Sequence, residues 1–170
     1  YNRGILWAQT ARHQEAVAQF DKVIAIAPEI SNCYLNRGAS LDELGLHAEA
    51  ISSYTRATDL NPENSFALFN RARTNYYLGN LHDALTDYSQ VIKLTPDDAE
   101  AFNNRGLAYD ALMDYDEAIR DFDKALELRP YFAEAHSNRG AVLEVMGDLD
   151  GALAAYNQSL ESDAELASAH

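Results

Sequence analysis

The sequence has a single cysteine and no long apolar run. Cys33 cannot form a disulfide within the chain, and its aromatic surroundings favour a small core residue over a nucleophile. No apolar segment approaches the roughly 18 residues of a membrane helix, so we expect no membrane insertion. The lone cysteine does not reveal the redox compartment, and the cytoplasm is only a default expectation.

Basic residues are scarce. Thirteen lysines and arginines stand against 27 acidic residues, which gives a net charge of -14. Nucleic acids and anionic membrane surfaces need a basic footprint, so both are excluded as expected partners. The acidity favours neutral or basic protein partners, or it only keeps an extended surface solvated.

Patterns of catalytic and metal-binding residues are also absent. The five histidines, at 13, 47, 82, 136 and 170, do not stand in a His-Glu-x-x-His or mixed cysteine–histidine arrangement. No glycine-rich loop is suited to cradle a phosphate. His13 and His47 share a repeat position in a turn between helices, which indicates the surface. We therefore predict no catalytic residue, no metal and no cofactor, and we do not expect an enzyme.

What the sequence does have is a repeat of 34 residues. Prolines recur at this spacing, and so do alanines, aromatic residues and an Asn-Arg-Gly tripeptide. The prolines are Pro28, Pro62, Pro96 and Pro130; the alanines are Ala16, Ala50, Ala84, Ala118 and Ala152; the aromatic residues are Phe20, Tyr54, Tyr88, Phe122 and Tyr156. Agreement at independent positions predicts tandem copies of one structural unit.

Within one unit, residues 31–64, the pattern is helical. Tyr34, Gly38 and Leu41 follow a 3-4 spacing that places them on one face of a first helix, and Gly45 suits its end. A second apolar series follows, and Pro62 suits the opening of the next helix. The glycines at 38, 106 and 140 are predicted to face the small alanines of the second helix. Since no unit can bury its apolar face alone, the units must stack.

With these residues the chain resembles the tetratricopeptide repeat family, and the resemblance covers the whole length of the chain. The resemblance implies an all-α fold, an α-solenoid of antiparallel helix pairs in a right-handed superhelix, whose first helices line a concave groove. One departure is systematic, because arginine stands where the family usually carries leucine: Arg3, Arg37, Arg71, Arg105 and Arg139.

The register of the repeat predicts a single array over residues 1–170. Its units are 1–30 (partial), 31–64, 65–98, 99–132 and 133–166, with 167–170 opening a sixth unit. We expect this array to be an excerpt of a longer array or of a larger protein. The last unit is less regular, since Ala164 replaces the expected proline.

Asparagine occupies one position of the predicted groove in every unit: Asn2, Asn36, Asn70, Asn104 and Asn138. Asparagine is a mediocre helix former, so its recurrence needs a reason. A primary amide can donate to and accept from an extended peptide backbone. This asparagine ladder resembles that of the repeat arm of protein O-linked N-acetylglucosamine transferases. Bracing between neighbouring helices is the alternative.

The arginines stand one residue further on, rotated by about 100° toward the neighbouring unit. Because a buried guanidinium needs partners, Asp21, Asp87, Asp121 and Asp123 are the expected ones. We interpret the arginines as braces between units.

Selectivity is expected in the third unit, where aromatic residues and an arginine cluster on the groove positions. Phe69, Arg73, Tyr76 and Tyr77 are predicted to contact the ligand, whereas Phe66 is the aromatic most expected to pack between helices. Acidic residues flank this cluster, among them Asp42 and Asp110, and others at 43, 100, 134 and 144. The lysines with which some relatives grip an acidic chaperone tail are missing.

The predicted function is therefore a protein–protein interaction scaffold that binds an extended, neutral-to-basic peptide segment in the concave groove. Two alternatives are a module that self-associates through uncapped ends, which expose apolar faces, and the substrate-recruiting arm of a larger enzyme.

Overall fold

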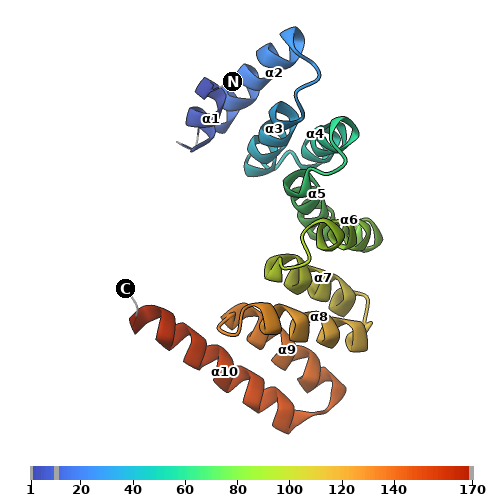
Figure 1. Ribbon diagram of the computed structural model, residues 1–170, viewed down its shortest axis with the longest axis vertical. Coiled ribbons are helices and arrows are strands. Elements are labelled where there is room, and N and C mark those ends of the chain that lie inside the picture. Colours follow the sequence, from blue (N-terminus) through green and yellow to red (C-terminus); the bar gives the residue numbers. More distant parts are fainter. Residues whose placement is uncertain (1, 10–11, 169–170) are drawn as a thin grey trace. The chain divides into compact units, whose positions relative to one another are not determined.

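The computed structural model describes residues 2–9 and 12–168, and within them it contains ten α-helices and no strand (Figure 1). The helices are α1 (Asn2–Gln9), α2 (His13–Ile26), α3 (Ser31–Glu43), α4 (His47–Leu60), α5 (Ser65–Tyr77), α6 (Leu81–Leu94), α7 (Ala99–Ala111), α8 (Tyr115–Leu128), α9 (Ala133–Met146) and α10 (Leu149–Ser168). The prediction of an all-α array of helix pairs is confirmed.

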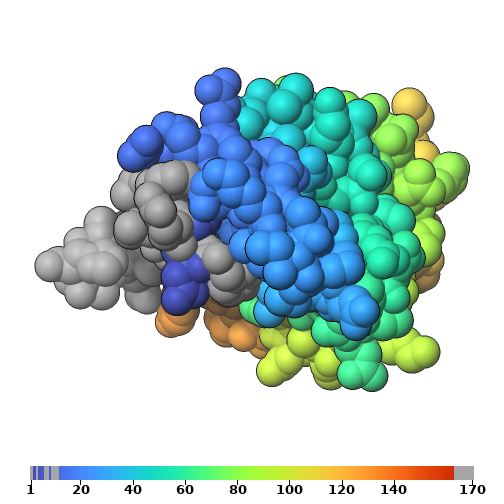
Figure 2. All heavy atoms as spheres, turned by 90° about the horizontal axis from the view of Figure 1, so that it is seen from above, coloured from blue at the N-terminus to red at the C-terminus, as the bar shows by residue number. Residues whose placement is uncertain are grey.

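Consecutive helices pack as pairs, α1 with α2 through α9 with α10. The turns inside three of these pairs contain Gly45, Gly79 and Gly147, each with a positive φ that glycine adopts without strain. The chain divides into two compact units, residues 1–94 and residues 95–170. In the first unit α2 also packs on α3 and α4 on α5, and in the second α8 packs on α9. The blue atoms of α2 abut the cyan atoms of the following pair in the space-filling view (Figure 2).

The core of each pair is built from the alanine and the aromatic residue of its second helix. Ala50 and Tyr54 are fully buried, and the corresponding residues of α2, α6 and α8 are as well. The prediction that the glycines face these alanines was wrong, because Gly38 lies against the aromatic ring. A β-carbon added to Gly38 would come within 2.6 Å of Tyr54 Cε1, and the other three glycines at this position meet their aromatic rings in the same way.

Helix α10 differs from the other second helices. It runs for 20 residues to Ser168, whereas α4, α6 and α8 each have 14 residues. Ala164 stands where the other units carry proline, so the helix is not interrupted. Ala167 and Ser168 therefore continue α10 and do not open a new helix as predicted, and residues 169–170 lie outside the described part. Among the described helices, none is long and apolar enough to cross a membrane.

Candidate functional site

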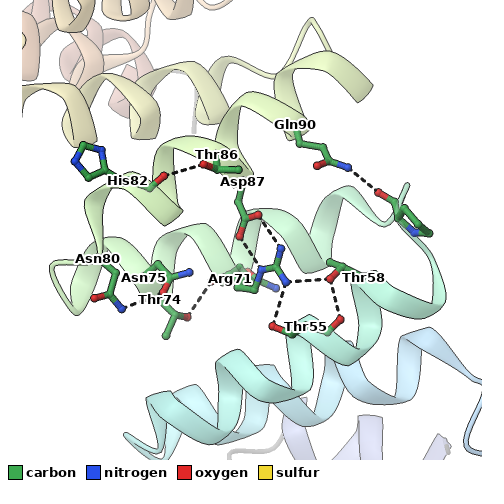
Figure 3. Close-up of polar contacts among 12 residues, drawn as sticks. Thr55, Thr58, Arg71, Thr74, Asn75, Asn80, His82, Thr86, Asp87 and Gln90 are labelled. Atoms are coloured by element: carbon green, nitrogen blue, oxygen red, sulfur yellow. Dashed lines mark hydrogen bonds and ion pairs between the residues drawn. The ribbon is translucent and has the colours of Figure 1, made fainter.

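Arg71 on α5 is held by side chains of two helices (Figure 3). Its Nε and Nη2 atoms donate to the two carboxylate oxygens of Asp87 on α6, at 2.7 and 2.8 Å. Its Nη1 atom donates to Thr55 and Thr58 of α4. The bidentate hydrogen bonds to Asp87 raise the pKa of Arg71, which keeps the half-buried guanidinium charged.

The ion pairs of the arginine ladder confirm all four predicted aspartates but follow two arrangements. Arg105 pairs with Asp121 inside its own helix pair, as Arg71 does with Asp87. Arg37 instead binds Asp21 of the preceding pair at 2.7 Å, and Arg139 binds Asp123 of the preceding pair at 2.6 Å. The interpretation of the arginines as braces between units is confirmed for Arg37 and Arg139 by these ion pairs. Arg71 also reaches the preceding pair, through Thr55 and Thr58, whereas the ion pair of Arg105 lies within its own pair. The side chain of Arg3 lies outside the described residues.

Helix α5 presents four side chains at i, i+4, i+7 and i+11, which places them on one face. We call this set, Phe66, Asn70, Arg73 and Tyr77, the α5 stripe. Phe66 and Tyr77 are 73% and 74% exposed, and Arg73 is exposed as well. No salt bridge of Arg73 and no hydrogen bond of the Asn70 amide is found among the described residues. The stripe therefore offers aromatic surface, an amide and a cation to a partner.

The two other aromatic residues predicted for the groove have a different place. Phe69 and Tyr76 pack against the cluster of Ala72, Ala84 and Tyr88, and the rings of Phe69 and Tyr88 meet edge to face at 5.5 Å. The roles that the sequence suggested are thus reversed: Phe66 is exposed, and Phe69 and Tyr76 contribute to the core. The reason is that positions 69, 72 and 76 share the face that turns toward α6.

Beside the α5 stripe lies a hollow of about 300 Å³, lined by Asp42, Glu43, His47, Arg73, Thr74 and Tyr77. Both carboxylate oxygens of Asp42 have partners, since one accepts from the hydroxyls of Tyr54 and Thr74 and the other lies 3.1 Å from His47 Nδ1. The ring of Tyr77 rests on His47, with centroids 4.9 Å apart.

This bonding corrects two predictions. Asp42 was expected to face a ligand, but its carboxylate joins α3 to α4 and α5. His47 was expected at the surface, but it is half-buried between Asp42 and Tyr77. Glu43, exposed at the rim of the same hollow, keeps its carboxylate available.

The asparagine ladder does not behave as one structure. The Nδ2 atoms of Asn36 and Asn104 donate to backbone carbonyls one turn earlier, those of Asn32 and Glu100, both at 2.8 Å. Asn138 braces a neighbouring helix, through Asn103 at 3.0 Å. Asn2 is exposed, and Asn70 has no hydrogen-bonded side chain among the described residues.

Asp110 on α7 occupies the repeat position of Asp42, but the aromatic residue of its own pair is Phe122, which has no hydroxyl to donate. Burial raises the pKa of this carboxyl group. Asp110 is thus a half-buried acid without the partner that Asp42 has.

Sequence reasoning missed the residues that join the pairs. Thr74, 4% exposed, reaches Asp42, and Asn64, 7% exposed, both caps α5 and donates to Ser31 of the preceding pair. Asn64 could have been found from its place just before a predicted helix start. Thr74 has no such signal, since it stands where the other units carry leucine, serine, alanine or valine. No cluster suited to a metal ion occurs within residues 2–9 and 12–168.

Three tetratricopeptide repeat models match the sequence, at residues 31–64, 73–112 and 99–132. The chain belongs to the tetratricopeptide repeat family, and it is a protein-interaction scaffold with the α-solenoid fold of that family.

Solved structures of similar fold include a MamA protein, at 24% identity and a TM-score of 0.92 over 97% of this chain and 96% of that one. MamA from Desulfovibrio magneticus RS-1 aligns at 20% identity and a TM-score of 0.91, over 96% and 93% of the two chains. YrrB, described as a TPR protein with an unusual peptide-binding site, aligns at 20% identity and a TM-score of 0.83, over 95% and 83%. The comparison with curated protein sequences finds no match.

Proposed function

We propose that the chain binds an extended, neutral-to-basic peptide segment along the first helices of its pairs, with the α5 stripe as the selective part of the site. The observation that carries this proposal is the stripe itself, which holds, between two exposed aromatic rings, an amide and a guanidinium without a side-chain partner in the described part of the chain. Aromatic residues and arginine are the residue types that dominate binding hot spots.

The stripe suits a peptide backbone. Asn70 can both donate and accept, and Arg73 can donate to backbone carbonyls, so neither contact depends on the sequence of the ligand. Other rungs of the asparagine ladder add similar contacts, for which Asn104 keeps its side-chain oxygen available. Each hydrogen bond contributes only about 1 kcal/mol, so several must act together.

Selectivity comes from the ends of the stripe and the hollow beside it. Phe66 and Tyr77 offer ring faces to an apolar or basic side chain, and Glu43 adds a carboxylate at the rim of the hollow. An acidic segment would be repelled by this carboxylate and by the net charge of -14. The printed description of YrrB as a peptide-binding TPR protein supports a peptide ligand.

The test starts from peptides selected on the wild-type chain from a display library, labelled and titrated by fluorescence anisotropy. Asn70→Ala and Asn104→Ala should each lower the affinity for all selected peptides about fivefold, which corresponds to the loss of one hydrogen bond. Tyr77→Ala should change which peptides bind, whereas Tyr76→Ala should act mainly on stability. Asn157→Ala, an exposed asparagine of α10, is the matched control and should leave affinity unchanged.

Equal affinity of wild type and of the Asn70 and Tyr77 variants would contradict the proposal. So would a selection that yields only acidic peptides.

One observation favours self-association as a second candidate. Leu149, Leu153 and Leu160 of α10 are 66%, 61% and 69% exposed, whereas the corresponding residues of the other second helices are half-buried. An exposed apolar face of this kind can pack against a second copy. Light scattering over a range of protein concentrations tests this, and a monomer at the highest concentration would remove the candidate.

A further inference from the structure

A second hollow lies in the unit of residues 95–170, at the turns between helices. It has a volume of about 400 Å³ and is lined by Met113, Asp114, Tyr115, Asp116, Glu117 and Met146. Met113 and Met146 are 73% and 47% exposed. Val145, just before Met146, and Leu149, three residues after it, are 63% and 66% exposed. Two successive turns thus bring large apolar side chains to the surface of one hollow.

The conformation of Met113 is unusual for a residue that carries a side chain. Its φ is 63°, in the left-handed region, at the repeat position where three other pairs have Gly45, Gly79 and Gly147. A side chain with a β-carbon is strained in this conformation, and the exposed thioether returns little by burial. Methionine is flexible and polarizable, which suits it to contact apolar groups of a partner.

The rim of the hollow is acidic. Asp114 and Asp116 form no salt bridge within the described part of the chain, whereas Glu117 pairs with Arg120. Asp148, in the turn before α10, and Asp150, in the first turn of α10, are exposed as well. A partner that covers the methionines must therefore carry positive charge around its apolar side chains, because like charges at this rim would repel it.

We propose that this turn surface binds a basic amphipathic helix of a partner protein, whose apolar side chains enter the hollow between Met113 and Met146 and whose lysines or arginines face Asp114 and Asp116. Apolar anchors ringed by charge of one sign are how an amphipathic helix docks in a groove. The proposal uses no residue of the α5 stripe, so it does not rest on the peptide-binding proposal. The turn surface would allow the scaffold to hold two partners.

The experiment uses the full chain and a capped model peptide of about 14 residues, with leucines along one helical face and lysines elsewhere. Binding is measured by calorimetry, and the contact surface by NMR chemical-shift changes. We expect changes centred on residues 113–117 and 144–149. A peptide with glutamates in place of the lysines should not bind.

The decisive variant is Met113→Gly. It should weaken the lysine peptide about tenfold, because an apolar anchor is lost, and it should also raise Tm by about 2–4 °C, because the strained φ is relieved. Loss of binding in a more stable protein cannot be explained by unfolding. Gly79→Met, the same exchange reversed at the equivalent turn of the third pair, should lower Tm and leave the affinity unchanged.

The double variant Asp114→Asn, Asp116→Asn should bind the lysine peptide more weakly than the wild type does, and this loss of affinity should be larger at low salt than at high salt. The proposal is overturned when Met113→Gly keeps wild-type affinity, when the glutamate peptide binds equally well, or when the shift changes lie elsewhere on the chain. Absence of binding by the lysine peptide would overturn it too.

Discussion

The pairs α3–α4 and α5–α6 have the same backbone plan but solve the same two chemical problems differently. The first problem is the hydroxyl of the buried tyrosine in the second helix. Tyr54 donates to Asp42 at 2.8 Å, whereas the hydroxyl of Tyr88 is buried with no hydrogen-bond partner among the described residues. The cause is the residue at the position of Asp42, which in α5 is Tyr76.

The second problem is the arginine of the first helix. Arg37 finds its carboxylate in the preceding pair, at Asp21, and uses Ser53 of its own pair as a neutral acceptor. Arg71 finds its carboxylate in its own pair, at Asp87, and uses Thr55 of the preceding pair as a neutral acceptor. Arg37 and Arg71 thus each bind one carboxylate and at least one hydroxyl. The carboxylate of Arg37 and the hydroxyl of Arg71 come from the preceding pair, and the other acceptor in each case comes from the arginine's own pair. The repeat conserves the interaction although the residues that make it differ.

The largest expected effect comes from removing a buried carboxylate. Asp87 is 7% exposed and Arg71 is 19% exposed, so Asp87→Asn should leave a largely buried guanidinium unpaired and cost about 3 kcal/mol in unfolding free energy. Asp21 is 52% exposed, so Asp21→Asn should cost less than about 1 kcal/mol. Urea denaturation of both variants measures the difference, and equal losses would contradict it.

A sharper version of this experiment exchanges the positions of the carboxylate and the hydroxyl around Arg71. Asp87→Ser combined with Thr55→Asp copies onto Arg71 the arrangement that Arg37 has with Ser53 and Asp21. The double variant should recover about half of the stability that the single Asp87→Ser variant loses, because a carboxylate is again present. No recovery would show that the two arrangements are not equivalent.

The contact of the glycine with the aromatic ring gives the next effect. Gly38→Ala would place a β-carbon 2.6 Å from the ring of Tyr54, so the ring must shift and the free energy of unfolding should fall by about 2 kcal/mol. Ala72 occupies the same position in α5 and is tolerated there, fully buried. Ala72→Gly should therefore cost only about 1 kcal/mol, through backbone entropy. Thermal unfolding of the two single variants compares them, and a neutral Gly38→Ala would refute the argument.

A smaller effect separates the two tyrosines. Tyr54→Phe removes a hydrogen bond to a carboxylate and should cost about 1.5 kcal/mol. Tyr88→Phe removes a hydroxyl that has no partner among the described residues, so stability should stay within about 0.5 kcal/mol or rise. Chemical denaturation of both variants at neutral pH tests this, and a larger loss for Tyr88→Phe would reverse the interpretation.

The same tyrosines predict a pH dependence. Burial raises the pKa of Tyr54 and of Tyr88, and Asp42 raises that of Tyr54 further. Because the folded state holds these protons more tightly than the unfolded state, their contribution is complete below pH 10 and is lost as pH rises above it. Stability should therefore fall above about pH 10. The double variant Tyr54→Phe, Tyr88→Phe should show a shallower fall, and an equal slope would exclude these two groups as its cause.

The sequence predicted the helices, the partners of the arginines and the composition of the core, because these follow from periodicity and from charge. The sequence-based prediction was wrong where the direction of a side chain decides whether a residue lies in the core or at the surface. Phe66 and Phe69 are three residues apart and equally apolar, and only the rotation of α5 shows that Phe69 faces Tyr88 while Phe66 faces solvent. Asp42 was misjudged because its three donors come from α4 and α5, a convergence that sequence spacing does not reveal.

The smallest expected effect concerns Asp110, which occupies the repeat position of Asp42 but has no tyrosine hydroxyl as a partner. Asp110 faces no hydroxyl from Phe122, and burial raises the pKa of its carboxyl group, so ionisation is slightly unfavourable to the fold. Asp110→Asn should raise the free energy of unfolding by about 0.3 kcal/mol at most, since the group is partly solvated. The gain should be present at pH 7 and vanish at low pH, where both states are protonated. If Asp110→Asn destabilises the protein as Asp42→Asn must, the carboxylate of Asp110 is structural. If stability is kept while peptide affinity falls, the acid serves the ligand.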